Sequence, residues 1–115
     1  MTRKLLIATP KMLTFETGGT RRDLTLFNSS ESCMAVELRG VNAQKYKVAI
    51  DAAILGPASL VKIPIERSKH NYPNDAKVRV YFVLVSSEAT DAKLAISEMS
   101  EDAQHGELEI NLKSI

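Results

Sequence analysis

Residues 23–28 read Asp-Leu-Thr-Leu-Phe-Asn, and this stretch decides the fold class because its leucines occupy every second position. Successive side chains of a β-strand point to opposite faces, so a period of two predicts a strand with one buried face. Five further segments either repeat this period or are apolar at nearly every position: 34–39, 46–50, 61–65, 78–85 and 107–112. The chain is therefore predicted to consist mainly of short strands.

Turn-forming residues separate these segments. Glycine, proline, asparagine, serine and aspartate gather at 18–19, 28–30, 40, 56–57, 71–75 and 106. Short strands that recur about every 10 residues are typical of a sandwich with a Greek-key path. We predict an all-β fold, an immunoglobulin-like seven-stranded β-sandwich, formed by residues 1–115 as a single domain.

Two prolines lie inside strand-like segments, Pro10 and Pro64. Because proline has no N–H to donate to a strand ladder, both are expected on edge strands or bulges. Proline is also the residue at which cis peptide bonds occur, and the sequence leaves the state of Thr9–Pro10 and Ile63–Pro64 open.

Residues 90–103 break the period of two and are rich in alanine, glutamate and lysine. Ala92, Ile96 and Met99 are spaced so that they share one face of a helix. Thr90 or Asp91 can cap the helix N-terminus. We predict one short helix before the last strand, covering an end of the sandwich.

Charge and cysteine content limit the expected environment and partners. The 15 Lys and Arg residues balance 14 Asp and Glu residues and are interspersed with them, which argues against nucleic acid or an anionic membrane as a partner. Cys33 is the sole cysteine, so no intramolecular disulfide is expected. No secretory leader or membrane span is legible. These features predict a cytoplasmic protein.

The residues that usually perform chemistry are few and scattered. His70 and His105 are both expected in surface loops, and no Cys-x-x-Cys or His-x-x-x-His spacing occurs. Cys33 begins a predicted strand far from both histidines and is interpreted as a spectator thiol. We therefore predict no catalytic residue, no metal ligand and no cofactor, and a non-enzymatic function in recognition.

Several segments, in order, resemble the major sperm protein (MSP) domain family. They are Ala8-Thr9-Pro10 with Leu13-Thr14-Phe15, which resembles a proline-kinked first strand, then 24–30, 34–39, 45–48, 55–59 and 61–65. One departure is Gly56, which stands where the family has the aspartate of an Asp-Pro turn. The residues before the last strand, 89–92, are similar to those of short nematode sperm relatives.

The resemblance implies an MSP/PapD-like sandwich and one of two kinds of protein interaction. Filament-forming members dimerise and polymerise in crawling sperm, and small relatives act as accessory proteins. The first hypothesis is thus a cytoskeletal or filament-associated protein of the sperm pseudopod, with itself, as a homodimer, or other MSP-family proteins as partners. Its edge strands and sheet faces would make the contacts.

The alternative is a peptide-binding adaptor. Membrane-anchored MSP domains capture acidic peptides with a two-phenylalanine motif, through a lysine near the strand that corresponds to residues 78–85. Lys77 precedes that strand but does not match the family's lysine position, and Arg21 and Arg22 can add positive charge. These three are the candidate partner-binding residues.

Overall fold

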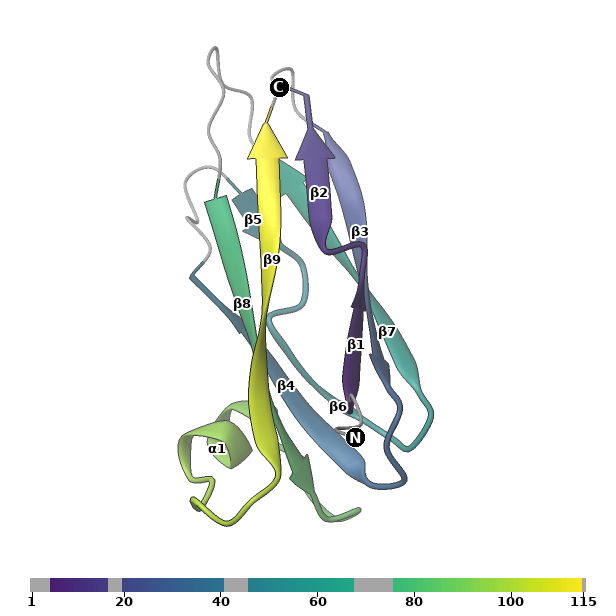
Figure 1. Ribbon diagram of the computed structural model, residues 1–115, viewed down its shortest axis with the longest axis vertical. Coiled ribbons are helices and arrows are strands. Elements are labelled where there is room, and N and C mark those ends of the chain that lie inside the picture. Colours follow the sequence, from purple (N-terminus) through teal and green to yellow (C-terminus); the bar gives the residue numbers. More distant parts are fainter. Residues whose placement is uncertain (1–4, 17–19, 41–45, 68–75, 115) are drawn as a thin grey trace, which may run out of the picture.

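The computed structural model describes residues 5–16, 20–40, 46–67 and 76–114 and consists mostly of β-strands (Figure 1). The strands are β1 (Leu6–Thr9), β2 (Met12–Phe15), β3 (Arg21–Asn28), β4 (Cys33–Arg39), β5 (Tyr46–Val48), β6 (Ala52–Leu55), β7 (Leu60–Arg67), β8 (Ala76–Val85) and β9 (His105–Ser114). The helix α1 (Ala92–Ser97) lies between β8 and β9. The predicted β-sandwich, with one short helix before the last strand, is confirmed, but the described residues form nine strands and not seven, because the first strand is divided at Pro10 and β6 is an additional strand.

The strands form two sheets that pack face to face. The four-stranded sheet has the order β1-β3-β7-β5, and the five-stranded sheet has the order β2-β9-β8-β4-β6. All neighbouring pairs are antiparallel except β2 and β9, which run parallel. The β6 strand was not predicted, because Ala52–Leu55 shows no alternation: three of its four residues are half-buried.

The core lies between the sheets and is filled by the alternating residues of every long strand. Leu24 and Leu26, which defined the period of two, are both fully buried. The ring of Phe15 from β2 meets the ring of Tyr46 from β5 edge-on, with centroids 5.2 Å apart. This contact joins the two sheets at one end of the sandwich, and aromatic pairs of this geometry stabilise cores beyond the area they bury.

Pro10 stands where the first strand changes sheets. β1 pairs with β3 in the four-stranded sheet, whereas β2, two residues later, pairs with β9 in the five-stranded sheet. The Thr9–Pro10 peptide bond is cis. The expected kinked first strand is therefore present, and Pro10 lies between two strands that are each at the edge of a sheet.

The expectation that Pro64 lies on an edge or bulge is wrong, because β7 is an interior strand between β3 and β5. The Arg67 N–H donates to the Thr20 carbonyl, so the peptide groups of Arg67 face β3. In an antiparallel ladder the residues that face one neighbour alternate with those that face away. Pro64 is three positions before Arg67, so its peptide groups point away from β3. On the other side the Pro64 carbonyl accepts from the Ala49 N–H at 3.1 Å, just beyond β5. Pro64 therefore lacks an N–H at a position where β5 has already ended.

The helix is shorter than its sequence pattern predicts. Asp91 is the N-cap, and its carboxylate accepts a hydrogen bond from the Leu94 N–H at 3.1 Å. Ala92 and Ile96 are buried as expected, against Ala35 and Val83 of the outer face of β4 and β8. Met99 lies beyond the helix end and is exposed, so its assignment to the buried face is wrong.

Candidate interaction surfaces

Two arginines and a tyrosine gather on the outward face of the five-stranded sheet. Arg39 of β4 and Arg79 of β8 are direct cross-strand neighbours, and Tyr81 follows Arg79 on the same face. The Arg39 guanidinium carbon lies 5.0 Å from the centroid of the Tyr81 ring, within the range of a cation–π contact. These three residues are called the arginine–tyrosine cluster below.

Acidic side chains hold the cluster in place. The Arg39 Nε donates to the Glu37 carboxylate at 2.9 Å, and the Nη2 atom approaches the same oxygen at 2.6 Å. Glu37 is only 9% exposed, so this carboxylate is a fixed orienting group rather than a mobile surface charge. A side-chain hydrogen bond to Tyr81, aided by the nearby Glu107 and Glu109, raises the pKa of Arg79 above its ordinary value. Arginine side chains are not deprotonated in proteins, so the cluster is basic.

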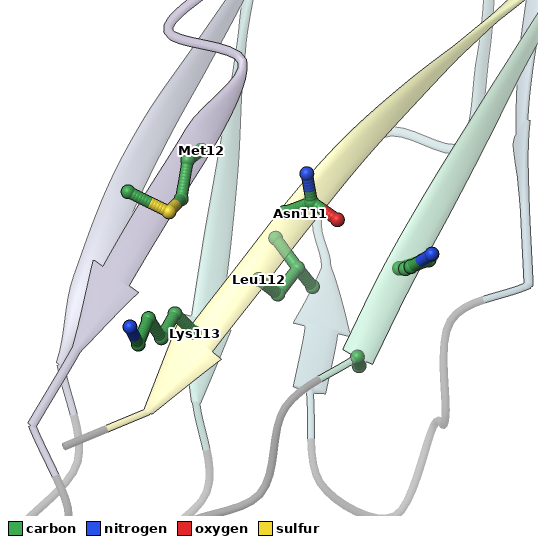
Figure 2. Close-up of a pocket in the computed structure, with 6 residues that line it drawn as sticks. Met12, Asn111, Leu112 and Lys113 are labelled. Atoms are coloured by element: carbon green, nitrogen blue, oxygen red, sulfur yellow. The ribbon is translucent and has the colours of Figure 1, made fainter.

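Lys77 lies further along β8 on the same outward face. Its ammonium group is 3.2 Å from the Glu109 carboxylate. It lines a shallow pocket with a volume of about 310 Å³, together with Met12, Asn111 and Lys113. Figure 2 shows these neighbours on the adjacent strands β2 and β9. Lys77 and Lys113 extend the positive charge of the arginine–tyrosine cluster along the sheet.

Arg21 and Arg22 lie on the other sheet, so the structure does not bring the three predicted residues together. Both belong to β3 and are exposed. The Arg21 guanidinium is 3.8 Å from the Asp23 carboxylate, and Arg22 donates to the Arg21 carbonyl at 3.0 Å. Contacts of this kind between exposed groups contribute little to stability or recognition.

Sequence reasoning missed Arg39 and Arg79 as candidate binding residues. A signal for two of the three cluster residues was present, since Arg79 and Tyr81 alternate with Lys77 along one strand and must share a face. Arg39 could not be added from sequence, because its position opposite Arg79 depends on the register of two strands that are 40 residues apart in the chain.

The outward face of the four-stranded sheet carries a different surface, a row of apolar side chains. Ile7, Phe27 and Leu60 are consecutive cross-strand partners on β1, β3 and β7. Ile7 is 41% exposed and Leu60 is 56% exposed, while Phe27 between them is half-buried. These three residues are called the apolar row. It begins at β1, which is an edge strand with no neighbour on its other side within the described residues.

The remaining potentially reactive side chains are dispersed. Cys33 is half-buried at the start of β4, and His105 is exposed at the start of β9. His70 lies outside the described residues. In the part of the chain that the structure describes, no three His, Cys, Asp or Glu side chains are close enough to share a metal ion. None of its helices has the length and apolar character that crossing a membrane requires.

Comparison with known proteins identifies the family. The family model of the MSP (major sperm protein) domain matches residues 4–105, which includes eight of the nine strands. This chain belongs to the MSP domain family. Comparison with curated proteins found no significant match.

Solved structures of MSP-family proteins share this fold over nearly their whole length. WR4, an MSP family member of C. elegans, superposes with a TM-score of 0.88 at 18% identity, covering 98% of this chain and 100% of its own. SSP-19, an MSP-domain protein of C. elegans, gives 0.83 at 21% identity, covering 93% and 96%. The PapD-like domain 7 of human CEP192 gives 0.59 at 15% identity, covering 100% and 90%. These likenesses confirm the MSP/PapD-like fold.

Proposed function

We propose that this MSP-domain protein is a non-enzymatic interaction protein that assembles with itself or with other MSP-family proteins, as a cytoskeletal or filament-associated component of nematode sperm. The apolar row carries the proposal. The likeness to two C. elegans MSP-family proteins over nearly their whole length supports the proposal that the protein belongs to nematode sperm. The proposed location is the cytoplasm, at the pseudopod.

The apolar row has the character of a contact surface. Large apolar side chains that adjoin one another on a surface mark interaction sites more often than isolated ones. Leu60 and Ile7 are exposed on the flat face of a sheet, and the row runs to the free edge of β1. A second chain that uses the same row would form a closed dimer, whereas one that uses a different surface would extend into a filament.

Sedimentation velocity over a wide concentration range, alone and with a filament-forming MSP protein, tests the proposal. The variant Leu60→Lys places a charge in the apolar row and is expected to weaken association at least about tenfold, because a buried leucine contributes about 1.5–3 kcal/mol. Leu94→Lys is the matched control, since Leu94 is a 50% exposed leucine on α1, away from the row. A wild-type monomer that ignores filaments, or equal loss in both variants, would contradict the proposal.

The arginine–tyrosine cluster favours a second candidate function, a peptide-binding adaptor. Two guanidinium groups beside an aromatic ring suit a peptide that carries carboxylates and aromatic side chains. Titration with an acidic peptide containing two phenylalanines tests this. Arg79→Glu is expected to abolish saturable binding, whereas the double variant Arg21→Glu/Arg22→Glu, on the other sheet, leaves it within about twofold. Equal binding by all three proteins would exclude the cluster as the site.

A further inference from the structure

A groove opens between the sheets where β1 and β9 pass each other without pairing. β2 pairs with β9 only from Asn111 onward, and β1 belongs to the other sheet. Figure 1 shows β2 beside the end of β9 and β1 standing away from its beginning. The groove has a volume of about 320 Å³, and its lining is mainly apolar, including Leu5, Ile7, Ala8, Phe82 and Leu108.

The backbone of β9 directs hydrogen-bonding groups into this groove. In an antiparallel pair, residues whose N–H and C=O groups face the partner alternate with residues whose groups face away. The Gln104 carbonyl accepts from the Leu84 N–H on the β8 side, and the Asn111 N–H donates to the Lys11 carbonyl on the opposite side. This alternation turns the peptide groups of three residues toward the groove: His105, Glu107 and Glu109.

These peptide groups form a free strand edge. Among the described residues, no strand pairs with this side of β9 before Asn111. An edge with three unpaired residues at alternate positions is a template for one more strand of about five residues. Because β8 is bonded on the other side, the added strand would extend the five-stranded sheet toward β1.

The lining of the groove at Gly106 is apolar and can contact an inward-pointing side chain of an added strand. Gly106 has no side chain, and a Cβ atom placed there would lie 2.8 Å from the Cζ atom of Phe82. The Phe82 ring therefore lies directly against the backbone at this position. An apolar residue on an added strand would contact the Phe82 ring and Leu108, where water now has access.

The charges beside the free edge select the other residues of the added strand. Glu107 is exposed and has no ion pair within 4.0 Å among the described side chains. The Glu109 carboxylate already forms an ion pair with Lys77. Lys11 also lines the groove, but it adjoins Met12, the partner of Asn111, and so belongs to the end of the groove beyond Glu107. Opposite charges on directly paired strands attract, so basic residues fit beside these glutamates.

We propose that this groove binds an extended peptide of alternating apolar and basic residues, which adds to the free edge of β9 as a short strand. Its backbone bonds to His105, Glu107 and Glu109, its apolar side chains enter the groove, and its basic side chains lie beside Glu107. The groove shares Ile7 with the apolar row but not Leu60, so the variant Leu60→Lys distinguishes the two surfaces, and its preferred charge is opposite to that of the acidic-peptide site proposed above.

Amide hydrogen exchange with a synthetic probe tests the proposal. The probe is the blocked peptide Lys-Val-Lys-Val-Lys-Val-Lys, and the control replaces each lysine with glutamate. Saturation with the basic peptide is expected to slow exchange of the amides at 105, 107 and 109 at least about tenfold, because they pass from solvent into a ladder. The acidic peptide is expected to bind at least about tenfold more weakly.

Two variants separate the backbone contribution from the charge. Glu107→Pro removes an N–H that faces the groove and takes no part in the β8 ladder, so the fold is retained while peptide binding is lost. Glu107→Gln retains the N–H and is expected to weaken binding by no more than about fivefold. Glu98→Gln, an exposed glutamate beyond α1, is the charge control and is expected to change nothing. Leu60→Lys should also leave peptide binding intact.

Three outcomes would overturn the proposal. The first is equal binding of the acidic and basic peptides, and the second is protection that maps elsewhere on the chain. The third is protection of the three amides that rises with protein concentration in the absence of peptide, since a second copy would then be the occupant of the groove.

Discussion

Asn28 joins two turns at one end of the sandwich and is fully buried. Its amide nitrogen donates to three carbonyls, those of Ser32, Leu55 and Gly56, at 2.8–3.1 Å. Its side-chain oxygen accepts from the N–H and the hydroxyl of Ser30. The turn expected at residues 28–30 is confirmed, and one amide connects it to the turn after β6.

The variant Asn28→Ala is expected to lower the free energy of unfolding by about 2–4 kcal/mol, because it leaves buried carbonyls without donors. Urea denaturation measures this loss. Ser32→Ala is the control, since Ser32 takes part only through its backbone and is exposed. Similar stability of both variants would mean that water replaces the amide without cost.

Gly106 is a second residue whose importance depends on a long-range contact. The variant Gly106→Ala must displace the Phe82 ring, which a Cβ atom would approach to 2.8 Å. We expect a loss of about 1–3 kcal/mol in thermal or urea denaturation. Gly56→Ala is the comparison, because its Cβ atom would meet only the exposed Ser59 hydroxyl, at 3.3 Å, and should cost less. A reversed order would contradict the close packing at Gly106.

At the scale of elements, β8 is the central strand of the five-stranded sheet, and its two faces differ. Val78, Val80 and Phe82 face the core, whereas Arg79 and Tyr81 face outward. The nearly continuous apolar run at residues 78–85 is typical of a strand buried on both faces, but only Val83 is buried on the outer side, where α1 covers it.

The variant Val80→Asp is therefore expected to unfold the domain, since an unpaired carboxylate in the core costs more than about 4 kcal/mol. Arg79→Asp, one residue away on the outer face, should remain folded. Circular dichroism at increasing temperature distinguishes the two. A folded Val80→Asp protein would show that the assignment of the inner face of β8 is wrong.

The helix α1 is tied to the loop before β6 by one ion pair. The Lys93 ammonium lies 2.8 Å from the Asp51 carboxylate. This hydrogen bond lowers the pKa of Asp51 below its ordinary 3.8 and raises that of Lys93 above its ordinary value. Because the folded state favours ionised Asp51, the pair stabilises the fold at neutral pH, and its contribution is lost as the pH falls below 3.8.

We accordingly expect Asp51→Asn to lower the melting temperature slightly at neutral pH and to leave it unchanged well below the ordinary pKa of an aspartate. Both groups are exposed, so the effect at neutral pH should also shrink in concentrated salt. Melting curves at several pH values and salt concentrations measure this. A difference that persists in acid or in salt would indicate a role for Asp51 other than the ion pair.

At the scale of the whole molecule, both sheets contribute to one continuous core. Its members come from β1, β2, β3, β4, β5, β6, β7, β8 and β9 alike. We therefore expect one cooperative unfolding transition, with a heat-capacity change of about 1.4–1.7 kcal/mol/K for 115 residues. Calorimetry and circular dichroism should give the same midpoint. Two separate transitions would show that the sheets unfold independently.

The alternation of apolar residues determined most of the fold by itself. It placed five strands with their core-facing residues, because a strand with one buried face must follow a period of two, and a nearly continuous apolar run placed β8 without distinguishing its two faces. The order of weak motifs also indicated the MSP family. Thr90 and Asp91 were the two candidate caps for the helix, and the structure has Asp91 at that position, where its carboxylate satisfies a free N–H group.

Only the tertiary structure decided where surfaces with potential function lie. Arg39 meets Arg79 and Tyr81, Ile7 meets Phe27 and Leu60, and the free edge of β9 exists because β1 joins the other sheet. Each of these depends on the register and order of strands that are distant in the chain. Register is a property of pairs, set by packing across the whole core, and a local pattern in one strand carries no information about its partner.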